Sequence, residues 1–347
     1  MKYNGRYPLF PADRIGTYPV VERSNRVTLE NLLSPDSVLR TRYDLEDQGA
    51  TLAKLALRIA AAIRSDRPVI WFIGAHVVKN GLGPLLVDLI RRRAITLVAT
   101  NGAGAIHDFE LALIGQTSEH VPRGLSEGRF GMAREFGYIN AALAEGEEQK
   151  LGFGEALGRF ICDPVFRHAV ETRLAPNRQV DFTHAETSII AAAYEQGVPL
   201  TVHVGVGTDV IDQHPNFDGS AKGGCSGRDF LIFAQEITRV GGGGVVLNVS
   251  SAVTGPEVLL KAVSMAGNVG KAPAGIVTAD FDLSPYCPDN MQNESSPDYY
   301  VRHQKSVATR IPQAFGGEGF YVRGDHRVTV PRLYQEIIRS LEGGPIT

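Results

Sequence analysis

The sequence predicts an α/β protein built on a doubly wound, mostly parallel, Rossmann-like sheet. Short, wholly apolar runs such as residues 69–73 recur along the chain, as expected for parallel strands covered by helices on both faces. Each run is followed by a glycine-containing turn and then by apolar residues at helical spacing. About five or six such strand–helix units in one chain favour this fold class.

The segment 69–115 contains the first two units. We expect a strand over 69–73, a helix over 82–90, a second strand over 95–99 and a small-residue turn over 100–104. The carboxyl ends of adjacent parallel strands lie at one edge of a sheet, so the two turns predict a crevice where backbone N–H groups meet a phosphate. Neither turn fits G-x-G-x-x-G, and the alternative is that these glycines only permit tight packing.

The rest of the chain continues the same alternation. We expect an N-terminal arm over 1–40 that wraps the domain or a neighbouring subunit, followed by a single α/β nucleotide-binding domain over 41–342. A helical insertion is expected over about 117–181. The other expected elements are helices over 44–65, 187–195, 229–240 and 256–266, and strands over 199–204, 245–249 and 274–279.

Composition indicates a cytoplasmic enzyme. The 347 residues include 35 Lys and Arg against 38 Asp and Glu, and this balance gives no sign of a nucleic-acid or membrane surface. No apolar run approaches the roughly 18–20 residues of a membrane span. Three widely spaced cysteines predict neither a disulfide framework nor a structural zinc site. Cys225 precedes the helix expected at 229, whose N-terminus would lower a thiol pKa, although most such cysteines are small buried residues.

Polar residues collect where the expected strands end, which is where open α/β sheets bind ligands. A single one would more often be a cap or a turn residue, but four loops share the bias. They are Asn101, His107 and Asp108 after one strand, Asp209, Asp212 and His214 after another, Asn248 and Ser250 after a third, and Asp280 and Asp282 after a fourth.

From about Val69 to Arg310 the sequence resembles the deoxyhypusine synthase family. IGAHVVKNGLGPLLVDLI and VATNGAGAIHDFELALIG are similar to the family's two nucleotide loops, and ETSIIAAAYEQGVPLTVHVGVGTDV is similar to its helix, strand and Thr-Asp loop. GGGGVVLNVSS matches its Gly-Gly-Gly-Val-Val turn. VTADFDLS followed by SPDYYVRHQKSV matches the region of its active-site lysine.

The resemblance implies an NAD-dependent transferase, a homotetramer with no resident metal, that holds an amine or polyamine-like substrate as an imine on a lysine. Lys305 stands at the family's spacing after Pro297 and Asp298. Its amine must be partly deprotonated, which burial or a neighbouring cation such as Arg302 can achieve. The alternative is a solvated lysine on a polar helix face.

Other roles follow from the resemblance and from the strand-end positions. Catalysis is assigned to Lys305, Asn248, His107 and His303, and substrate binding to Asp212, His214, Asp282 and Asp298. NAD binding is assigned to Gly74, Asn80, Thr100, Asn101, Gly102, Gly104, Asp108, Asp209, Gly243, Thr278, Ala279 and Asp280.

The sequence departs from the family in the expected substrate pocket. Asn248, with Leu247 before it, stands where the family has a histidine base, and His303 replaces a tryptophan. His107 and Tyr299 replace acidic residues. A desolvated dication needs anionic partners, so we expect spermidine transfer to be weak.

Two other classes of function remain open from the sequence. The spacing H-x5-D-x2-D-x-H of His203, Asp209, Asp212 and His214 suits a metal-assisted hydrolase or lyase. The missing base also suits a non-catalytic nucleotide-binding protein.

Overall fold

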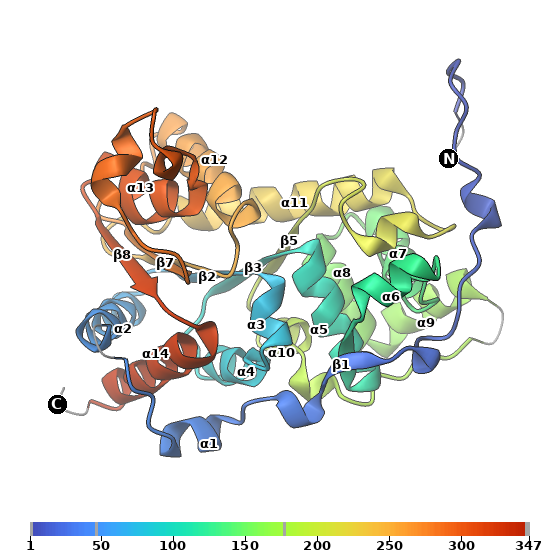
Figure 1. Ribbon diagram of the computed structural model, residues 1–347, viewed down its shortest axis with the longest axis horizontal. Coiled ribbons are helices and arrows are strands. Elements are labelled where there is room, and N and C mark those ends of the chain that lie inside the picture. Colours follow the sequence, from blue (N-terminus) through green and yellow to red (C-terminus); the bar gives the residue numbers. More distant parts are fainter. Residues whose placement is uncertain (1–2, 46–47, 176–177, 344–347) are drawn as a thin grey trace.

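The computed structural model describes residues 3–45, 48–175 and 178–343, and a parallel sheet forms its centre (Figure 1). The sheet has six strands in the order β5-β3-β2-β6-β7-β8, and every pairing is parallel. The strands are β2 (Val69–Ile73), β3 (Leu97–Asn101), β5 (Leu200–His203), β6 (Val245–Val249), β7 (Val277–Asp282) and β8 (Glu318–Arg323). In chain order this is 3-2-1-4-5-6, the classic dinucleotide-binding order. The predicted doubly wound, Rossmann-like class is confirmed.

Helices cover both faces of the sheet, and β2 shows why its residues are all apolar. Trp71 and Ile73 belong to one buried cluster, with residues of α2, α4, α10 and α14, while Ile70 and Phe72 belong to a second, with α11 and α12. Figure 1 shows these two sets on opposite sides of the sheet. Their bounds are α2 (Gly49–Arg64), α4 (Gly83–Arg91), α10 (Ile189–Glu195), α11 (Gly219–Ile237), α12 (Thr254–Asn268) and α14 (His326–Leu341).

Further helices lie between strands. They are α1 (Pro35–Arg40), α3 (Ala75–Lys79), α5 (Gly102–Ile114) and α13 (Ile311–Ala314), and two of them, α3 and α5, begin at the carboxyl ends of β2 and β3. A π-helical turn, η8 (Gln304–Arg310), runs directly into α13. The 3-10 turns are η1 (Ala12–Arg14), η2 (Val20–Glu22), η3 (Leu29–Asn31), η4 (Ala185–Thr187), η5 (Val210–Gln213), η6 (Pro288–Gln292) and η7 (Pro297–Tyr300).

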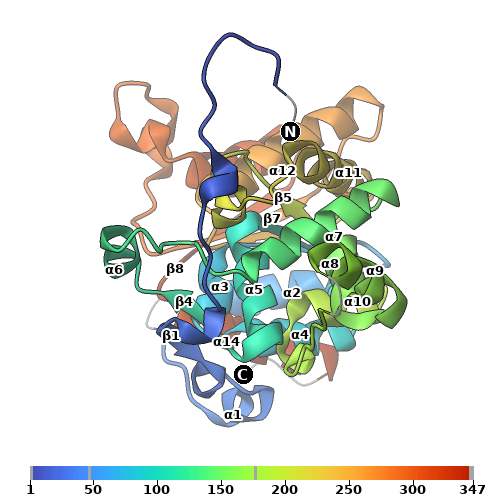
Figure 2. The ribbon, with the colours of Figure 1, turned by 90° about the vertical axis from the view of Figure 1, so that its right-hand side faces the viewer.

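The N-terminal arm and the segment after α5 lie together beside β5. β1 (Asn25–Thr28) pairs antiparallel with β4 (Gln116–Glu119), and the four helices α6 (Val121–Ser126), α7 (Phe136–Glu148), α8 (Phe153–Cys162) and α9 (Pro164–Leu174) follow. The first part of the arm projects from the body in both ribbon views (Figures 1 and 2). Residues 176–177 of the expected insertion lie outside the described residues.

Several element bounds differ from the sequence-based expectation, although β2 and β6 agree with it. The expected helix over 229–240 begins at Gly219, where Asp218 caps it by accepting hydrogen bonds from the N–H groups of Ser220 and Ala221. Its glycine-rich first half has poor helix propensity, and packing against α7 and β5 overrides this. The expected strands over 95–99 and 274–279 are shifted towards their carboxyl ends.

The helix expected over 44–65 is α2, and residues 46–47 of that range lie outside the described residues. Across the described ranges, no helix combines the length and apolarity needed to cross a membrane.

Candidate functional site

A polar crevice lies at the point where the strand order reverses, between β2 and β6. This switch point is where open α/β sheets bind ligands. A cavity of about 510 Å³ opens there. Its lining comes from the carboxyl ends of β2, β6 and β7 and from the start of α14: His76, Asn80, Asn248, Ser250, Ser251, Ala252, Phe281, Asp282, Leu283, His303, Asp325, His326 and Arg327.

The exits of β2 and β6 approach each other so closely that only glycine fits. A Cβ on Gly74 would lie 1.9 Å from the carbonyl oxygen of Ser250. Ser250 itself has a φ of 68°, a left-handed conformation that is strained for a residue other than glycine. Strained backbone of this kind clusters at ligand sites, and here it shapes the cavity wall.

Two buried side chains beneath the cavity keep unpaired oxygens. The Asn248 amide donates to the Ser251 carbonyl at 2.9 Å and to Asp280 Oδ1 at 2.7 Å. Asn248 Oδ1 and Asp280 Oδ2 have no hydrogen-bond partner among the described residues. Burial raises the pKa of Asp280 to about 6, against the charge of His303 and the Asn248 hydrogen bond. Native proteins rarely leave such atoms unsatisfied, so these two point to a ligand.

His303 and Asp282 form a hydrogen-bonded pair that faces the cavity. His303 Nε2 lies 2.6 Å from Asp282 Oδ2, so Nε2–H donates to the carboxylate and Nδ1 is left as an acceptor. Burial opposes the charged form of Asp282, but the hydrogen bonds from His303 and from the Leu283 N–H outweigh it and lower the pKa of Asp282. A histidine oriented by a carboxylate is the usual arrangement of a general base.

Charged groups at the cavity rim are already paired within the protein. Asp325 caps α14 by accepting from the Arg327 N–H at 2.8 Å, and its carboxylate also pairs with the Arg327 guanidinium. His76 stands opposite, and burial and the nearby Lys79 lower its pKa. The rim therefore offers a neutral imidazole rather than a spare carboxylate.

Lys305 is buried but does not line this cavity. Its side chain is 7% exposed, and Nζ lies 3.4 Å from the ring centre of Tyr299. Burial lowers the pKa of Lys305, with help from Arg310 and Arg302. The expectation that Lys305 lies beside the loops of both Asp209 and Asp282 is wrong, because these loops leave β5 and β7 and four strand spacings of about 4.8 Å separate them.

Asp298, expected to bind substrate, also lies outside the cavity lining. It accepts from the Asn290 amide at 2.9 Å within the loop before η8.

At the β3 exit, the small-residue turn expected over 100–104 is the end of a strand followed by the first turn of α5. Thr100 donates to the Ile73 carbonyl, and Asn101 caps α5 by accepting from the Gly104 N–H at 2.8 Å. A Cβ on Gly102 would meet the Asp209 carboxylate at 2.2 Å. These groups are engaged in holding the strand exit together.

Asp108 is a buried helix cap. It accepts hydrogen bonds from the Ser188 hydroxyl and from the N–H groups of Ile189 and Ile190 at the start of α10. Burial raises the pKa of Asp108 to about 6 despite these bonds. Because every bond it makes is internal, the structure gives it a packing role in place of the expected contact with NAD.

A buried lysine neutralises the acidic pair after β5. Lys222 Nζ lies 2.8 Å from Asp209 Oδ2 and 2.6 Å from Asp212 Oδ1, and its side chain has no exposed area. His203 stacks on Phe72 at the sheet face, and burial lowers its pKa to about 3.

His214 points away from this acidic pair, because its Nε2 contacts the Gly131 carbonyl at 3.1 Å. The described residues contain no group of three or more His, Cys, Asp and Glu side chains arranged to hold a metal. The spacing that suggested a metal site is therefore explained by packing and an internal ion pair.

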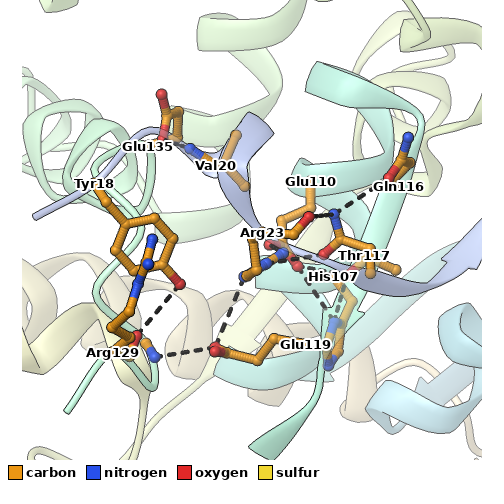
Figure 3. A network of polar contacts seen from close by, with 12 residues as sticks. Tyr18, Val20, Arg23, His107, Glu110, Gln116, Thr117, Glu119, Arg129 and Glu135 are labelled. Carbon is orange, nitrogen blue, oxygen red and sulfur yellow. Dashed lines mark hydrogen bonds and ion pairs between the residues drawn. The ribbon is translucent and has the colours of Figure 1, made fainter. Parts of the chain in front are cut away.

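His107 belongs to a network that fastens the N-terminal arm (Figure 3). Its Nδ1 lies 2.6 Å from the Thr117 hydroxyl, which donates to Glu110 at 2.5 Å. Arg23 of the arm pairs with Glu110 and lies 3.7 Å from Glu119. The expected catalytic role of His107 is not supported, because His107 does not line the switch-point cavity and its imidazole is engaged in this network on α5.

Three other expected NAD contacts lie away from the strand exits. Gly243, with a φ of 101°, is in the turn before β6 and so lies at the amino edge of the sheet. A five-residue strand separates it from the cavity by about 16 Å. Thr278 and Ala279 are buried inside β7, and the Thr278 hydroxyl donates to the Val307 carbonyl. The structure therefore does not support NAD contacts from these three residues, none of which lines the cavity.

Cys225 is a small buried residue, as the sequence favours, but its expected position before a helix is wrong. It lies in the middle of α11 rather than before a helix, and burial raises the pKa of its thiol to about 11. A buried thiol in this state packs as a small apolar residue.

Sequence reasoning missed three groups that the structure makes important. Lys222 lies in a glycine-rich stretch, and its pairing with Asp209 across a loop has no local signal in the sequence. His76 and His326 face the cavity from α3 and α14. His76 follows Gly74 closely enough that the strand-end rule could have found it.

Comparisons with known proteins add little beyond the fold. No family model matches the chain, and no curated protein matches it. Solved structures that resemble it include apo ArgZ, an arginine dihydrolase from the ornithine–ammonia cycle in cyanobacteria (TM-score 0.46, 15% identity, 86% of this chain and 32% of that one). Others are unliganded AgrE (TM-score 0.47, 13% identity, 87% and 34%) and a conserved putative LOR/SDH protein from Methanococcus maripaludis S2 (TM-score 0.45, 15% identity, 88% and 74%).

The chain spans about a third of the length of the ArgZ and AgrE proteins it resembles. At these TM-scores the likeness carries no argument about function. The sheet order itself defines the class, a parallel α/β protein with a doubly wound, Rossmann-like sheet.

Proposed function

We propose that this protein is a dinucleotide-dependent enzyme that oxidises an amine, with the His303–Asp282 pair as its proton acceptor. The main support for this proposal is that the hydrogen-bonded pair lines the cavity at the switch point of a 3-2-1-4-5-6 sheet. The cavity volume of about 510 Å³ lies within the range of about 300–1,000 Å³ typical of ligand sites. The glycine-only approach of Gly74 to Ser250 and the unpaired oxygens beneath the cavity fit a bound nucleotide.

The chemistry assigned to each group follows from its position. A bound nicotinamide would supply the hydride acceptor for the carbon next to the substrate nitrogen. His303 Nδ1 takes the N–H proton of the amine as the carbon–nitrogen double bond forms. Asp282 fixes the histidine tautomer and stabilises the imidazolium that results. Asn248 positions Asp280 beneath the reacting groups.

The resemblance to deoxyhypusine synthases supports a further step on Lys305. Its neutral amine attacks the imine carbon of the oxidised substrate, the original amine leaves, and a new imine joins the substrate carbon to Nζ. Two observations favour Lys305 for this. Burial lowers the pKa of Lys305, and no described carboxylate lies within 4.0 Å of Nζ. The loop that carries Tyr299 must turn for Nζ to reach the cavity.

The cavity favours a substrate with one ammonium group over a polyamine. Its two carboxylates, Asp282 and Asp325, already pair with His303 and Arg327. A second buried ammonium would lack an anionic partner. We therefore expect diaminopropane release from spermidine well below about one per second, the lower end of ordinary turnover.

The test follows reduction of NAD or NADP by absorbance with a panel of primary amines, spermidine and putrescine among them. His303→Gln and Asp282→Asn should lower the rate about 10²-fold or more. His168→Gln, on the exposed face of α9, is the matched control and should have no effect. Equal rates in the wild type and His303→Gln would refute the role of the pair. Binding without turnover on any amine would favour a non-catalytic nucleotide-binding protein.

Borohydride reduction tests the lysine step. A trapped adduct on the wild type that is absent from Lys305→Ala supports the imine. Turnover without any adduct would leave amine oxidation as the reaction and remove Lys305 from it.

A further inference from the structure

The carboxyl edge of the sheet carries a second cavity over β3 and β5, separate from the switch-point cavity. Its volume is about 300 Å³. α3 lies between the two, because His76 and Asn80 line the first while Lys79 lines the second. In a 3-2-1-4-5-6 sheet, a dinucleotide lies across the switch point with one nucleotide over each half. The second cavity is thus placed for the adenosine half.

The walls of this cavity suit a flat base. Ile106, Val121, Phe130, Phe136 and Val210 line it, from α5, the helical segment and the β5 exit. Adenine binding in such folds relies on apolar and aromatic contacts, with a few polar groups fixing orientation.

The acidic residues of the cavity are all paired within the protein. Glu110 and Glu119 face Arg23, as Figure 3 shows. Asp209 pairs with the buried Lys222. None of these carboxylates is left over to bind a ribose hydroxyl.

Two basic residues of the same cavity have no such partner. Lys79 is half-buried and Arg26 is exposed, and neither forms an ion pair with any described carboxylate. Arg23, the third, is fully engaged. Lys79 and Arg26 are therefore the two basic side chains that the cavity can offer to a ligand.

The residue at the end of β3 also lacks a negative charge. Folds of this type that take NAD place an acidic residue near this position to bind the ribose 2′-hydroxyl, and those that take NADP place an arginine nearby. Here the residue is Asn101, which is uncharged and whose oxygen already accepts the Gly104 N–H.

We propose that the second cavity binds an adenosine bearing a 2′-phosphate, with Lys79 and Arg26 as its phosphate ligands, and so selects NADP over NAD. This rests on the proposed dinucleotide-dependent function. The inference goes beyond that function because it assigns a preference for NADP, whereas the sequence predicts NAD. Lysine and arginine donors bind phosphate by charge-assisted hydrogen bonds.

Calorimetry with the full chain tests the proposal with two fragment probes, 2′,5′-ADP and 5′-AMP, and with NADP and NAD. The wild type should bind 2′,5′-ADP about 10-fold or more tighter than 5′-AMP, as one charge-assisted hydrogen bond allows. Lys79→Ala and Arg26→Ala should each remove most of that difference and leave 5′-AMP affinity unchanged. Lys271→Ala, exposed after α12, is the matched control and should keep the full preference.

Equal affinity for the two probes in the wild type would overturn the proposal, as would variants that weaken both probes alike. A 2′-phosphate preference in a protein that oxidises no amine would uphold this inference while the proposed function fails. If none of the four nucleotides binds, both fail together.

Discussion

The two halves of the sheet's carboxyl edge differ in how far their buried polar groups are paired within the protein. Over β6 and β7, Asp280 and Asn248 are buried with one oxygen each left unpaired among the described residues. Over β3 and β5, Asp209 and Asp212 are buried around Lys222, and Asn101 is engaged as a helix cap. Buried polar groups are normally hydrogen-bonded. The unpaired oxygens of the first half are therefore available to a ligand, whereas the polar groups of the second half stabilise the fold through contacts within the protein.

In the second half, removal of the buried cation Lys222 should have the largest effect on the free energy of unfolding. Lys222→Met should lower the free energy of unfolding by about 3–5 kcal/mol, because it leaves buried Asp209 and Asp212 without a counter-ion. Urea unfolding of the variant against Lys271→Ala measures this. Adding Asp209→Asn and Asp212→Asn should restore much of the loss. A stable Lys222→Met protein would contradict a structural role for the cluster.

In the first half, substitution of Asp280 should change the free energy of unfolding in the opposite direction and raise it. Burial raises its pKa to about 6 from 3.8, so the native state holds its proton more tightly than the unfolded state and stability falls as the pH rises between these values. Asp280→Asn should therefore raise the free energy of unfolding at pH 7.5 by about 2–3 kcal/mol. The gain should vanish below pH about 4. Urea titrations at both pH values decide this, and a loss of stability at pH 7.5 would show that the carboxylate is satisfied.

A backbone contact joins the two halves at the switch point. Gly74→Ala places a Cβ 1.9 Å from the Ser250 carbonyl oxygen, and the strain should lower the free energy of unfolding by about 1–3 kcal/mol. Nucleotide affinity should fall as well, since β2 and β6 are pushed apart at the cavity. Unfolding and calorimetry on one preparation check both effects. Unchanged nucleotide binding would move the ligand away from this point.

The smallest expected effect serves as the control for that substitution. Gly223 lies inside α11, and apart from the neighbouring backbone of the helix itself no described atom lies within 4 Å of the place that an added Cβ would take. Gly223→Ala should raise the free energy of unfolding by about 0.5–1 kcal/mol through helix propensity alone. Nucleotide affinity should stay the same. Destabilisation would indicate that this face of α11 is covered in solution.

Local pattern was enough to predict much of the fold. The apolar runs of β2 and β6 agree residue for residue with the strands, because a strand buried on both faces must be apolar throughout. The start of α11 was missed since glycines lower helix propensity while packing restores it. Which strands neighbour each other was not predictable from any single segment.

For the site, the sequence by itself determined that polar groups would gather at strand exits, since the strand–helix alternation dictates where each exit comes. Only the tertiary structure decided which exits share a cavity and which residues are already satisfied. His303 meets Asp282 across a long loop, and Lys222 reaches back to Asp209 and Asp212. Such contacts depend on distances between residues far apart in the chain, and local periodicity carries no information about them.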